Sequence, residues 1–489
     1  MAAEKSPRFS DHFQEILMLP KSTMAACGRA LIVAFACACG PMIAHAAGFQ
    51  LSETSGSGLG SAYAGGAAQA QDATTVWSNP AGMSRIGDSQ VSGALHLITP
   101  SLKFRNESST AAAGQGLGGN GGDAGSLAPV PNFYIVKPID SRISMGLGVS
   151  APWGLVTEYD AGWAGRFQAI KSSIKTINVN PTLSYKASDA LAVGLGLNIQ
   201  HMSAEFTNRV NYAGALLSAA ALNGIAPGSA GFNAIAAATA GLESGARVRG
   251  SDNAYGWNAG LLWSLNDRSR VGLHYRSSMK YRLDGTVGFT NPALPAGAPA
   301  VTALLAGGVN TTRLFNSAIT SDVKIPAIVN LSYFTQLDDR WDLMADAQWT
   351  QWSTIKYLTF MRANGAVLQN TPENFKNTWK VSIGANYHYS PQWTLRGGLA
   401  FDKSPVQRVD MTARLPDADR TMLTLGALYI VNPKLTLDMG AGYIFIKTAR
   451  INANGGNPGD PAAALSNGLL NGHYDSRAVI LSAQLNYRF

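Results

Sequence analysis

Catalysis and metal binding require reactive side chains at characteristic spacings, and this sequence of 489 residues lacks the common ones. It contains no GxSxG nucleophile motif, no HExxH metal motif and no cysteine pair beyond residue 40. We therefore predict no enzyme activity, no metal site and no cofactor. A catalytic set assembled only by folding, such as a lipase triad, is the remaining enzymatic alternative. The histidines beyond residue 47 are scattered: His96, His201, His274, His388 and His473.

Basic side chains could instead bind a carboxylate, because ammonium and guanidinium groups form charge-assisted hydrogen bonds with it. The candidates near the ends of expected strands are Arg209, Lys356, Lys376 and Arg396. Basic residues at such positions are more often solvated or luminal charges. The net charge of +8 could indicate nucleic-acid binding, but Lys and Arg are scattered rather than clustered. We expect no nucleic-acid partner.

The elements that must position these residues are strands. Apolar and polar residues alternate in Gln90–Ile98, Ser141–Ser150 and Leu191–Gln200, and the last segment, Val479–Phe489, ends on an aromatic residue. Alternate side chains of a strand point to opposite faces, so one face can meet lipid and the other a polar interior. About fourteen such segments, joined by alternating short turns and long loops, predict an all-β protein that is a transmembrane antiparallel β-barrel. A soluble sandwich would also alternate, but its polar face is rarely so consistently small and polar.

The N-terminal region differs from the rest. Lys21 and Arg29 precede the apolar run Ala30–Cys39, and Ala44-His45-Ala46 provides small residues for cleavage. We predict a signal peptide over 1–46 that contains all three cysteines, with translation starting at Met1, Met18 or Met24. Residues 47–88 are rich in Gly, Ala and Ser without strand periodicity, which indicates a plug in the lumen of a barrel formed by 89–489.

Several motifs resemble the FadL family of outer-membrane transporters. They are Gly48-Phe49-Gln50-Leu51, Ser57-Gly58-Leu59-Gly60, Asn79-Pro80-Ala81, Ala151-Pro152-Trp153-Gly154 and Phe401-Asp402-Lys403-Ser404-Pro405-Val406. The resemblance implies a 14-stranded barrel with an N-terminal hatch, in the outer membrane of a Gram-negative bacterium. It also implies passive uptake of long-chain fatty acids or related hydrophobic compounds. A nucleotide-binding GxGxxG motif is disfavoured, because Tyr63 occupies the third glycine position.

The third strand is interrupted where Pro cannot donate a ladder hydrogen bond and Gly weakens the strand. Ordinary strand termination is the alternative. In the family, an inward kink here opens the wall towards the membrane, and the resemblance implies that the Asn-Pro-Ala motif of the hatch meets this kink. The predicted substrate path therefore comprises Phe49, Asn79, Pro80, Ala81, Ser150, Pro152, Trp153 and Gly154.

The long loops contain apolar helical stretches at Ala213–Leu222, Phe232–Leu242 and Val301–Ala306. Exposed apolar helices suggest a groove for a hydrophobic ligand, whereas mutual packing of the helices is the alternative. The predicted substrate-capture residues are Leu216, Leu217, Leu304 and Leu305.

The basic residues do not match the positions expected for fatty-acid members of the family, so aromatic hydrocarbons or alkanes are an alternative substrate class. A receptor barrel for adhesion or phage docking is an alternative of another kind. A porin for polar solutes is disfavoured, because a plug has no obvious use there. The expected partners are the hydrophobic substrate, outer-membrane lipid and lipopolysaccharide, and the barrel-assembly machinery, with the protein as a monomer.

Overall fold

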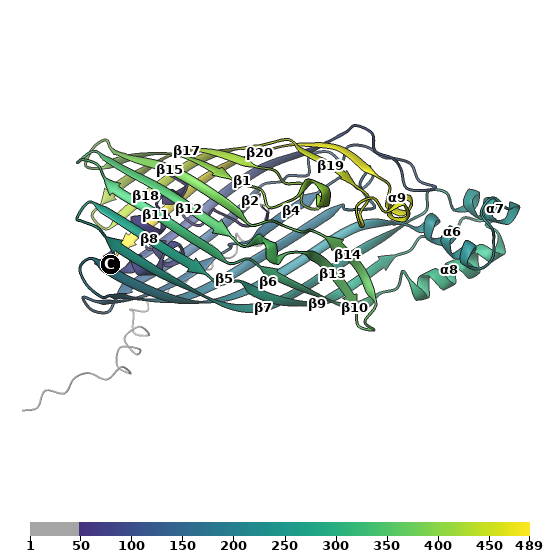
Figure 1. The fold of residues 1–489 in the computed structure, drawn as a ribbon, viewed down its shortest axis with the longest axis horizontal. Coiled ribbons are helices and arrows are strands. Elements are labelled where there is room, and N and C mark those ends of the chain that lie inside the picture. Colours follow the sequence, from purple (N-terminus) through teal and green to yellow (C-terminus); the bar gives the residue numbers. More distant parts are fainter. Residues whose placement is uncertain (1–47) are drawn as a thin grey trace, which may run out of the picture. The chain divides into compact units, whose positions relative to one another are not determined.

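The computed structural model describes residues 48–489, so the predicted signal peptide and the three cysteines lie outside the described residues. Within this range, 20 strand segments form one antiparallel sheet. The sheet closes on itself because β1 (Gln90–Asn106) pairs with β20 (Leu470–Arg488), from Gln90 opposite Arg488 to Asn106 opposite Gly472 (Figure 1). Closure pairs the first wall strand with the last, as a membrane barrel requires.

Six wall strands are each built from two consecutive segments, so the 20 segments make 20 − 6 = 14 wall strands, as predicted. The other continuous strands are β2 (Ala128–Pro138), β5 (Lys171–Lys186), β6 (Leu191–Asn211), β7 (Glu243–Ser264), β16 (Trp393–Asp402) and β17 (Arg420–Asn432). The split strands are β3 (Ile143–Ser150) with β4 (Gly154–Glu158), β8 (Ser269–Arg276) with β9 (Met279–Thr290), β10 (Ser317–Ile325) with β11 (Ile328–Gln336), β12 (Trp341–Thr350) with β13 (Tyr357–Arg362), β14 (Val367–Pro372) with β15 (Thr378–His388), and β18 (Leu435–Ile446) with β19 (Ala449–Ala453).

The two faces of the wall differ as the alternation predicts. In β6, Leu195 and Leu197 are 64% and 61% exposed on the outside, whereas Asn198 and Gln200 are buried inside. β6 continues to Asn211, well beyond the predicted Gln200. The predicted strand is too short because its outward residues become polar where the strand rises above the lipid. The alternation of apolar and polar residues therefore ends before the strand does.

Residues 48–88, here called the plug, lie inside the barrel. They form α3 (Gly56–Gly60), α4 (Gly66–Gln69), α5 (Thr75–Ser78) and the 3-10 helix η1 (Pro80–Arg85). α3 packs against β16, β17, β18 and β20, whereas α4 and η1 pack against β5 to β8 and β11 on the other side. Contacts around so much of the wall place this segment in the lumen, where irregular backbone is tolerated at membrane depth.

The long loops carry the remaining helices, and α6, α7 and α8 lie at the end of the barrel away from the C-terminus (Figure 1). No helix among residues 48–489 combines the length and the apolar character that a helical membrane span needs. The helices outside the plug are α6 (Tyr212–Leu222), α7 (Ala230–Thr239), α8 (Ala300–Thr312), α9 (Pro461–Asn467), and the 3-10 turns η2 (Trp352–Thr354) and η3 (Arg408–Asp410).

Candidate functional site

We call the end of the barrel that carries α6, α7 and α8 the upper end. An apolar cavity of about 570 Å³ lies in the lumen above the plug, on the side of the upper end. Ligand cavities of this size and character accommodate drug-sized apolar molecules. The wall strands contribute alternate inward residues, which carry apolar side chains here instead of the amides found lower in the lumen. Among the residues that line the cavity are Leu155, Ile174, Met202, Ala204, Phe206, Tyr281, Leu283, Val323, Ile355, Leu358, Phe375 and Leu415.

Phe49 and Phe375 line this cavity and belong to a cluster of four aromatic rings that also contains Trp153 and Trp352. Phe49 of the plug lies 5.6 Å from Trp153 and 5.2 Å from Trp352, measured between ring centroids. Trp352 is 5.6 Å from Trp153 and 6.0 Å from Phe375. Tilted and edge-on pairs at these distances are favourable, so the four rings hold one another in place. The cluster joins the plug to the interrupted third wall strand.

Arg414 and Glu373 supply charged groups to the cavity. The guanidinium of Arg414 is buried, and its donors lie 3.4 Å from the Lys171 carbonyl, Ser172 Oγ and Asn208 Oδ1. These contacts are longer than the usual 2.9–3.0 Å, so the guanidinium is held weakly and can turn to a ligand. Burial raises the pKa of Glu373 to about 8, although attraction to Arg414 opposes the shift. Glu373 is therefore mostly neutral at pH 7 and leaves the Arg414 charge free for an anion. The cavity is also lined by Asp252, Lys280, Arg282, Asp322 and Lys324.

The four predicted carboxylate partners do not line this cavity. Arg396 is buried deep in the lumen and pairs with Asp438 at 2.8 Å. Arg209 pairs with Glu243 at 3.6 Å, and Lys356 and Lys376 are exposed. Arg414 is not among the candidates predicted from sequence, because its side chain reaches the lumen only through the inward fold of the β16–β17 connection. Its one detectable signal is an arginine between the apolar residues Ala413 and Leu415.

The predicted break in the third wall strand is present. β3 ends at Ser150 and β4 begins at Gly154. β3 pairs with β2 over Phe133–Pro138, but in the described part of the chain β4 pairs only with β5, which leaves Ala128–Asn132 of β2 without a partner on that side. The hydrogen-bond ladder of the wall is therefore interrupted between β2 and β4.

The plug covers this interruption from inside. Leu51 belongs to the same buried apolar cluster as Ala128, Val130, Ala151 and Val156. Its backbone N–H donates to the Pro152 carbonyl at 2.8 Å. A Cβ on Gly154 would lie 3.2 Å from Leu51, so the absence of a side chain lets the plug approach closely.

Residues 49–51 of the plug, here called the plug strand, pair with the kink as a short antiparallel bridge. Gln50 is opposite Trp153, and the N–H of Gly154 donates to the carbonyl of Phe49 at 2.9 Å. The N–H of Gly48 also donates to Asp417 Oδ2 at 2.9 Å. Only a few hydrogen bonds would have to break to free the plug strand.

The Asn79-Pro80-Ala81 turn does not meet the kink, which corrects the contact predicted above. Asn79 is fully buried, and its amide donates to the carbonyls of Ala67 at 2.7 Å and Leu261 at 3.0 Å. The turn lies directly on Gly194 of β6 and Gly260 of β7, where added Cβ atoms would come within 2.4 Å and 1.8 Å of it. It fixes the far side of the plug, and the plug strand makes the contact with the kink.

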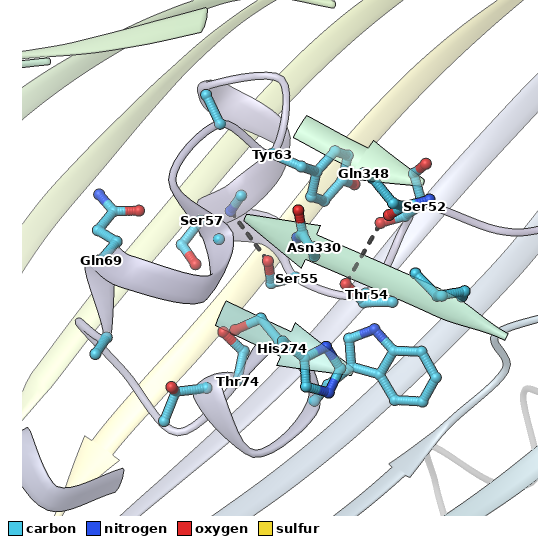
Figure 2. Close-up of a pocket in the computed structure, with 18 of the residues that line it drawn as sticks. Ser52, Thr54, Ser55, Ser57, Tyr63, Gln69, Thr74, His274, Asn330 and Gln348 are labelled. Atoms are coloured by element: carbon cyan, nitrogen blue, oxygen red, sulfur yellow. Dashed lines mark hydrogen bonds between the residues drawn. The ribbon is translucent and has the colours of Figure 1, made fainter. Parts of the chain in front are cut away.

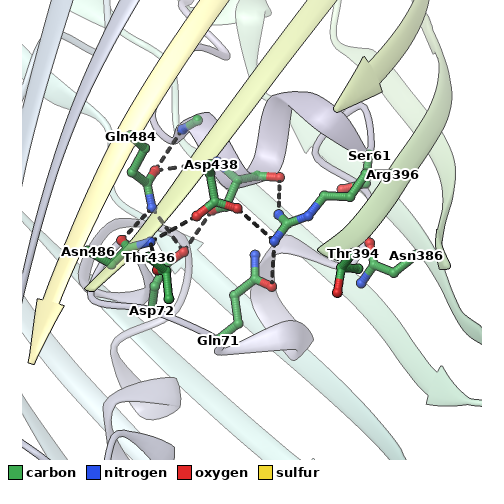
Figure 3. A network of polar contacts seen from close by, with 12 residues as sticks. Ser61, Gln71, Asp72, Asn386, Thr394, Arg396, Thr436, Asp438, Gln484 and Asn486 are labelled. Carbon is green, nitrogen blue, oxygen red and sulfur yellow. Dashed lines mark hydrogen bonds and ion pairs between the residues drawn. The ribbon is translucent and has the colours of Figure 1, made fainter. Parts of the chain in front are cut away.

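A buried polar network anchors the body of the plug to β16, β18 and β20 (Figure 3). Arg396 Nη1 donates to the Ser57 carbonyl at 2.6 Å while its Nη2 pairs with Asp438. Gln484 accepts from the N–H of Gly56 at 2.7 Å and donates to Asp72 at 3.0 Å. Breaking a buried, paired charge is costly, so wholesale movement of the plug is disfavoured.

A second, much smaller cavity of about 100 Å³ lies between the plug and β8, β11 and β12 (Figure 2). Polar side chains surround it, including Ser52, Thr54, Tyr63, His274 and Gln348. Its size and polarity suit a few water molecules rather than an apolar ligand.

The capture residues on the loops divide into two groups. Leu216 and Leu305 are buried in the packing between α6, α7 and α8, and Leu217 packs against the same cluster. Leu304, by contrast, is 78% exposed. Mutual packing therefore explains Leu216 and Leu305, so the prediction that they meet substrate directly was wrong. Leu304 remains a predicted capture residue. Leu222, which was not predicted from sequence, is also exposed.

Comparisons with known proteins agree with this architecture. Residues 37–489 match the family described as Outer membrane protein transport protein (OMPP1/FadL/TodX). The chain is 30% identical over 421 residues to the long-chain fatty acid transport protein of Escherichia coli K12, covering 84% of this chain and 90% of that protein. A Pseudomonas aeruginosa FadL homologue superposes with a TM-score of 0.79 at 27% identity, covering 91% of this chain and all of the other. The Pseudomonas putida toluene transporter TodX shares the fold, with a TM-score of 0.60 at 16% identity over 85% of this chain and 94% of its own. The chain belongs to the OMPP1/FadL/TodX family of outer-membrane transport proteins.

Proposed function

We propose that this protein takes up long-chain fatty acids, or closely related hydrophobic acids, by passive diffusion across the outer membrane. The observation that carries the proposal is the 570 Å³ apolar cavity with the weakly held guanidinium of Arg414 in its wall. An acyl chain would gain roughly 0.8 kcal/mol for each buried CH₂ group. Its carboxylate would accept charge-assisted hydrogen bonds from Arg414. The E. coli relative is named for the same substrate class.

The proposed route begins at exposed apolar residues of the loop helices and leads into the cavity. Release of the plug strand would then separate Phe49 from Trp153 and uncover the interruption between β2 and β4. The substrate would leave sideways into the membrane, which spares an apolar chain the polar lower lumen. The plug body would stay in place, since its network with Arg396 and Asp438 is buried and paired.

Aromatic hydrocarbons or alkanes are the second candidate substrates, supported by the apolar lining of the cavity. Such molecules have no use for a buried guanidinium, which favours acids. That the protein is not an enzyme is supported by the transport description of its family. A monomeric state and recognition by the barrel-assembly machinery stay predictions.

Growth of a deletion strain carrying this gene on a plasmid tests the substrate class. We expect the gene to restore growth on oleate as sole carbon source, because the acid uses both the cavity and Arg414. Restored sensitivity to toluene or growth on alkanes without oleate uptake would move the assignment to hydrocarbons. A plasmid that encodes the Arg414→Met variant serves as the matched control, since this substitution alters only the proposed acid-binding group.

A further inference from the structure

A second charged site lies at the upper rim of the wall, and none of its lining residues lines the proposed substrate cavity. The β16–β17 connection (403–419) folds inward, burying Met411 and Ala413, and leaves a cavity of about 590 Å³ at the upper ends of β15 to β18. We call this cavity the basic notch. Its exposed cationic side chains are Lys376, Lys403, Arg408, Lys447 and Arg450.

The notch carries a net positive charge. Lys403 and Lys447 share one carboxylate, Asp419, at 3.3 Å each, and their side chains are 59% and 69% exposed. Asp417, the other acidic residue of the lining, is buried and engaged by Arg420 and by Ser404 Oγ at 2.6 Å. Arg450 also reaches Glu107 at 3.4 Å. Because two ammonium groups share one carboxylate, each lysine keeps N–H donors that can bind an anion.

The depth of the notch follows from the strands below it. β15, β16, β17 and β18 contain 11, 10, 13 and 12 residues, close to the 9–11 residues with which a tilted strand crosses the hydrocarbon core. Trp379, Phe401 and Phe445 are exposed on the outside at their upper ends. Lys447 Nζ lies 5.9 Å from the Phe401 ring. The lysines therefore stand directly above an aromatic belt, at the level of the headgroups on the long-loop side.

We propose that the basic notch binds the phosphate groups of a glycolipid of the outer leaflet, of the lipid A type. Phosphate oxygens would replace part of the Asp419 contact with Lys403 and Lys447, and the acyl chains would lie along the aromatic surface below. Basic pockets beside membrane-spanning segments bind anionic headgroups through this combination of charge and depth. The notch and the substrate cavity share no lining residue, so lipid binding can be measured separately from uptake. The two regions meet at Asp417, which lines the notch and accepts from the N–H of Gly48 beside the plug strand.

The test measures binding of bis-phosphorylated lipid A to the purified full-length barrel in neutral detergent with EDTA, which removes bridging divalent cations. Native mass spectrometry gives the affinity. Each cation near an anionic headgroup contributes roughly fivefold in affinity. The double substitution Lys403→Gln/Lys447→Gln should therefore weaken binding roughly 25-fold, whereas Asp419→Asn should tighten it by removing the competing carboxylate.

The matched control is Lys434→Gln/Arg268→Gln, which removes the same charge from short turns at the opposite rim and should leave binding unchanged. Heat-modifiable migration verifies that every variant is folded. Dephosphorylated lipid A should bind all variants equally weakly. The proposal is overturned by wild-type affinity in the notch double variant, by an equal loss in the control, or by equal binding of dephosphorylated lipid.

Discussion

Removing the guanidinium in the substrate cavity, through Arg414→Met, is expected to weaken binding of a fatty acid selectively. Methionine keeps an apolar stem beside Phe206, whose ring centroid lies 5.3 Å from the guanidinium carbon. Within the protein, the change removes three hydrogen bonds at 3.4 Å and the attraction between Arg414 and Glu373. Because Glu373 is mostly neutral at pH 7, folding should tolerate the change. A hydrogen bond to a charged group contributes about 1.5–3 kcal/mol. Oleate should therefore bind roughly 10- to 150-fold more weakly.

Oleyl alcohol gives the internal comparison, because it has the same chain and no charge. Its affinity should be nearly unchanged, since its binding comes from burial of CH₂ groups. Displacement of a fluorescent acyl probe from purified protein measures both ligands. Arg209→Met is the matched control, since Arg209 pairs with Glu243 outside the cavity. Equal weakening of acid and alcohol, or an oleate affinity that survives the loss of Arg414, would show that Arg414 does not bind the carboxylate.

Three further perturbations follow from the same structure. The wild-type affinity for an alkyl sulfate, whose headgroup stays ionised, should fall as pH rises through about 8, because Glu373 is neutral below its raised pKa and competes for the Arg414 guanidinium above it. Glu373→Gln should make the affinity independent of pH in this range, and a pH dependence unchanged by the substitution would exclude Glu373 as its cause. Leu304→Asp should slow uptake at low substrate concentration with normal surface levels, whereas Leu216→Asp should expose the loop helices to proteolysis, and indistinguishable variants would count against an exposed capture surface. Asn79→Ala leaves buried carbonyls unpaired at about 1–3 kcal/mol, so hydrogen exchange in the plug should accelerate while the barrel stays folded; unaltered exchange would show that the turn does not hold the plug.

The barrel itself was predictable from sequence because its signal is local and repeated. Alternation along each strand, the terminal Phe489 and the Pro152–Gly154 break are all visible without knowing which strands meet. The extensions of β1 and β6 were missed, because outward residues above the lipid are polar and erase the contrast between the faces.

The binding site could not be predicted in the same way, because it depends on contacts between distant segments. Arg414 reaches the cavity only because the β16–β17 connection folds inward. Asn79 meets Leu261 rather than the kink because closure of the barrel brings β6 and β7 against that side of the plug. Leu216 has an apolar neighbourhood that only the packing of three loop helices reveals.

The central claim is that substrate leaves after the plug strand parts from the kink. Gln50 and Trp153 face each other across this pairing, so a Gln50→Cys/Trp153→Cys disulfide would lock it, and residues 48–489 contain no other cysteine. Oleate uptake per folded barrel should be abolished in the oxidised double variant and should return on reduction to the level of the single variants. Undiminished uptake through the oxidised, locked barrel would contradict release of the plug strand and lateral exit at the kink.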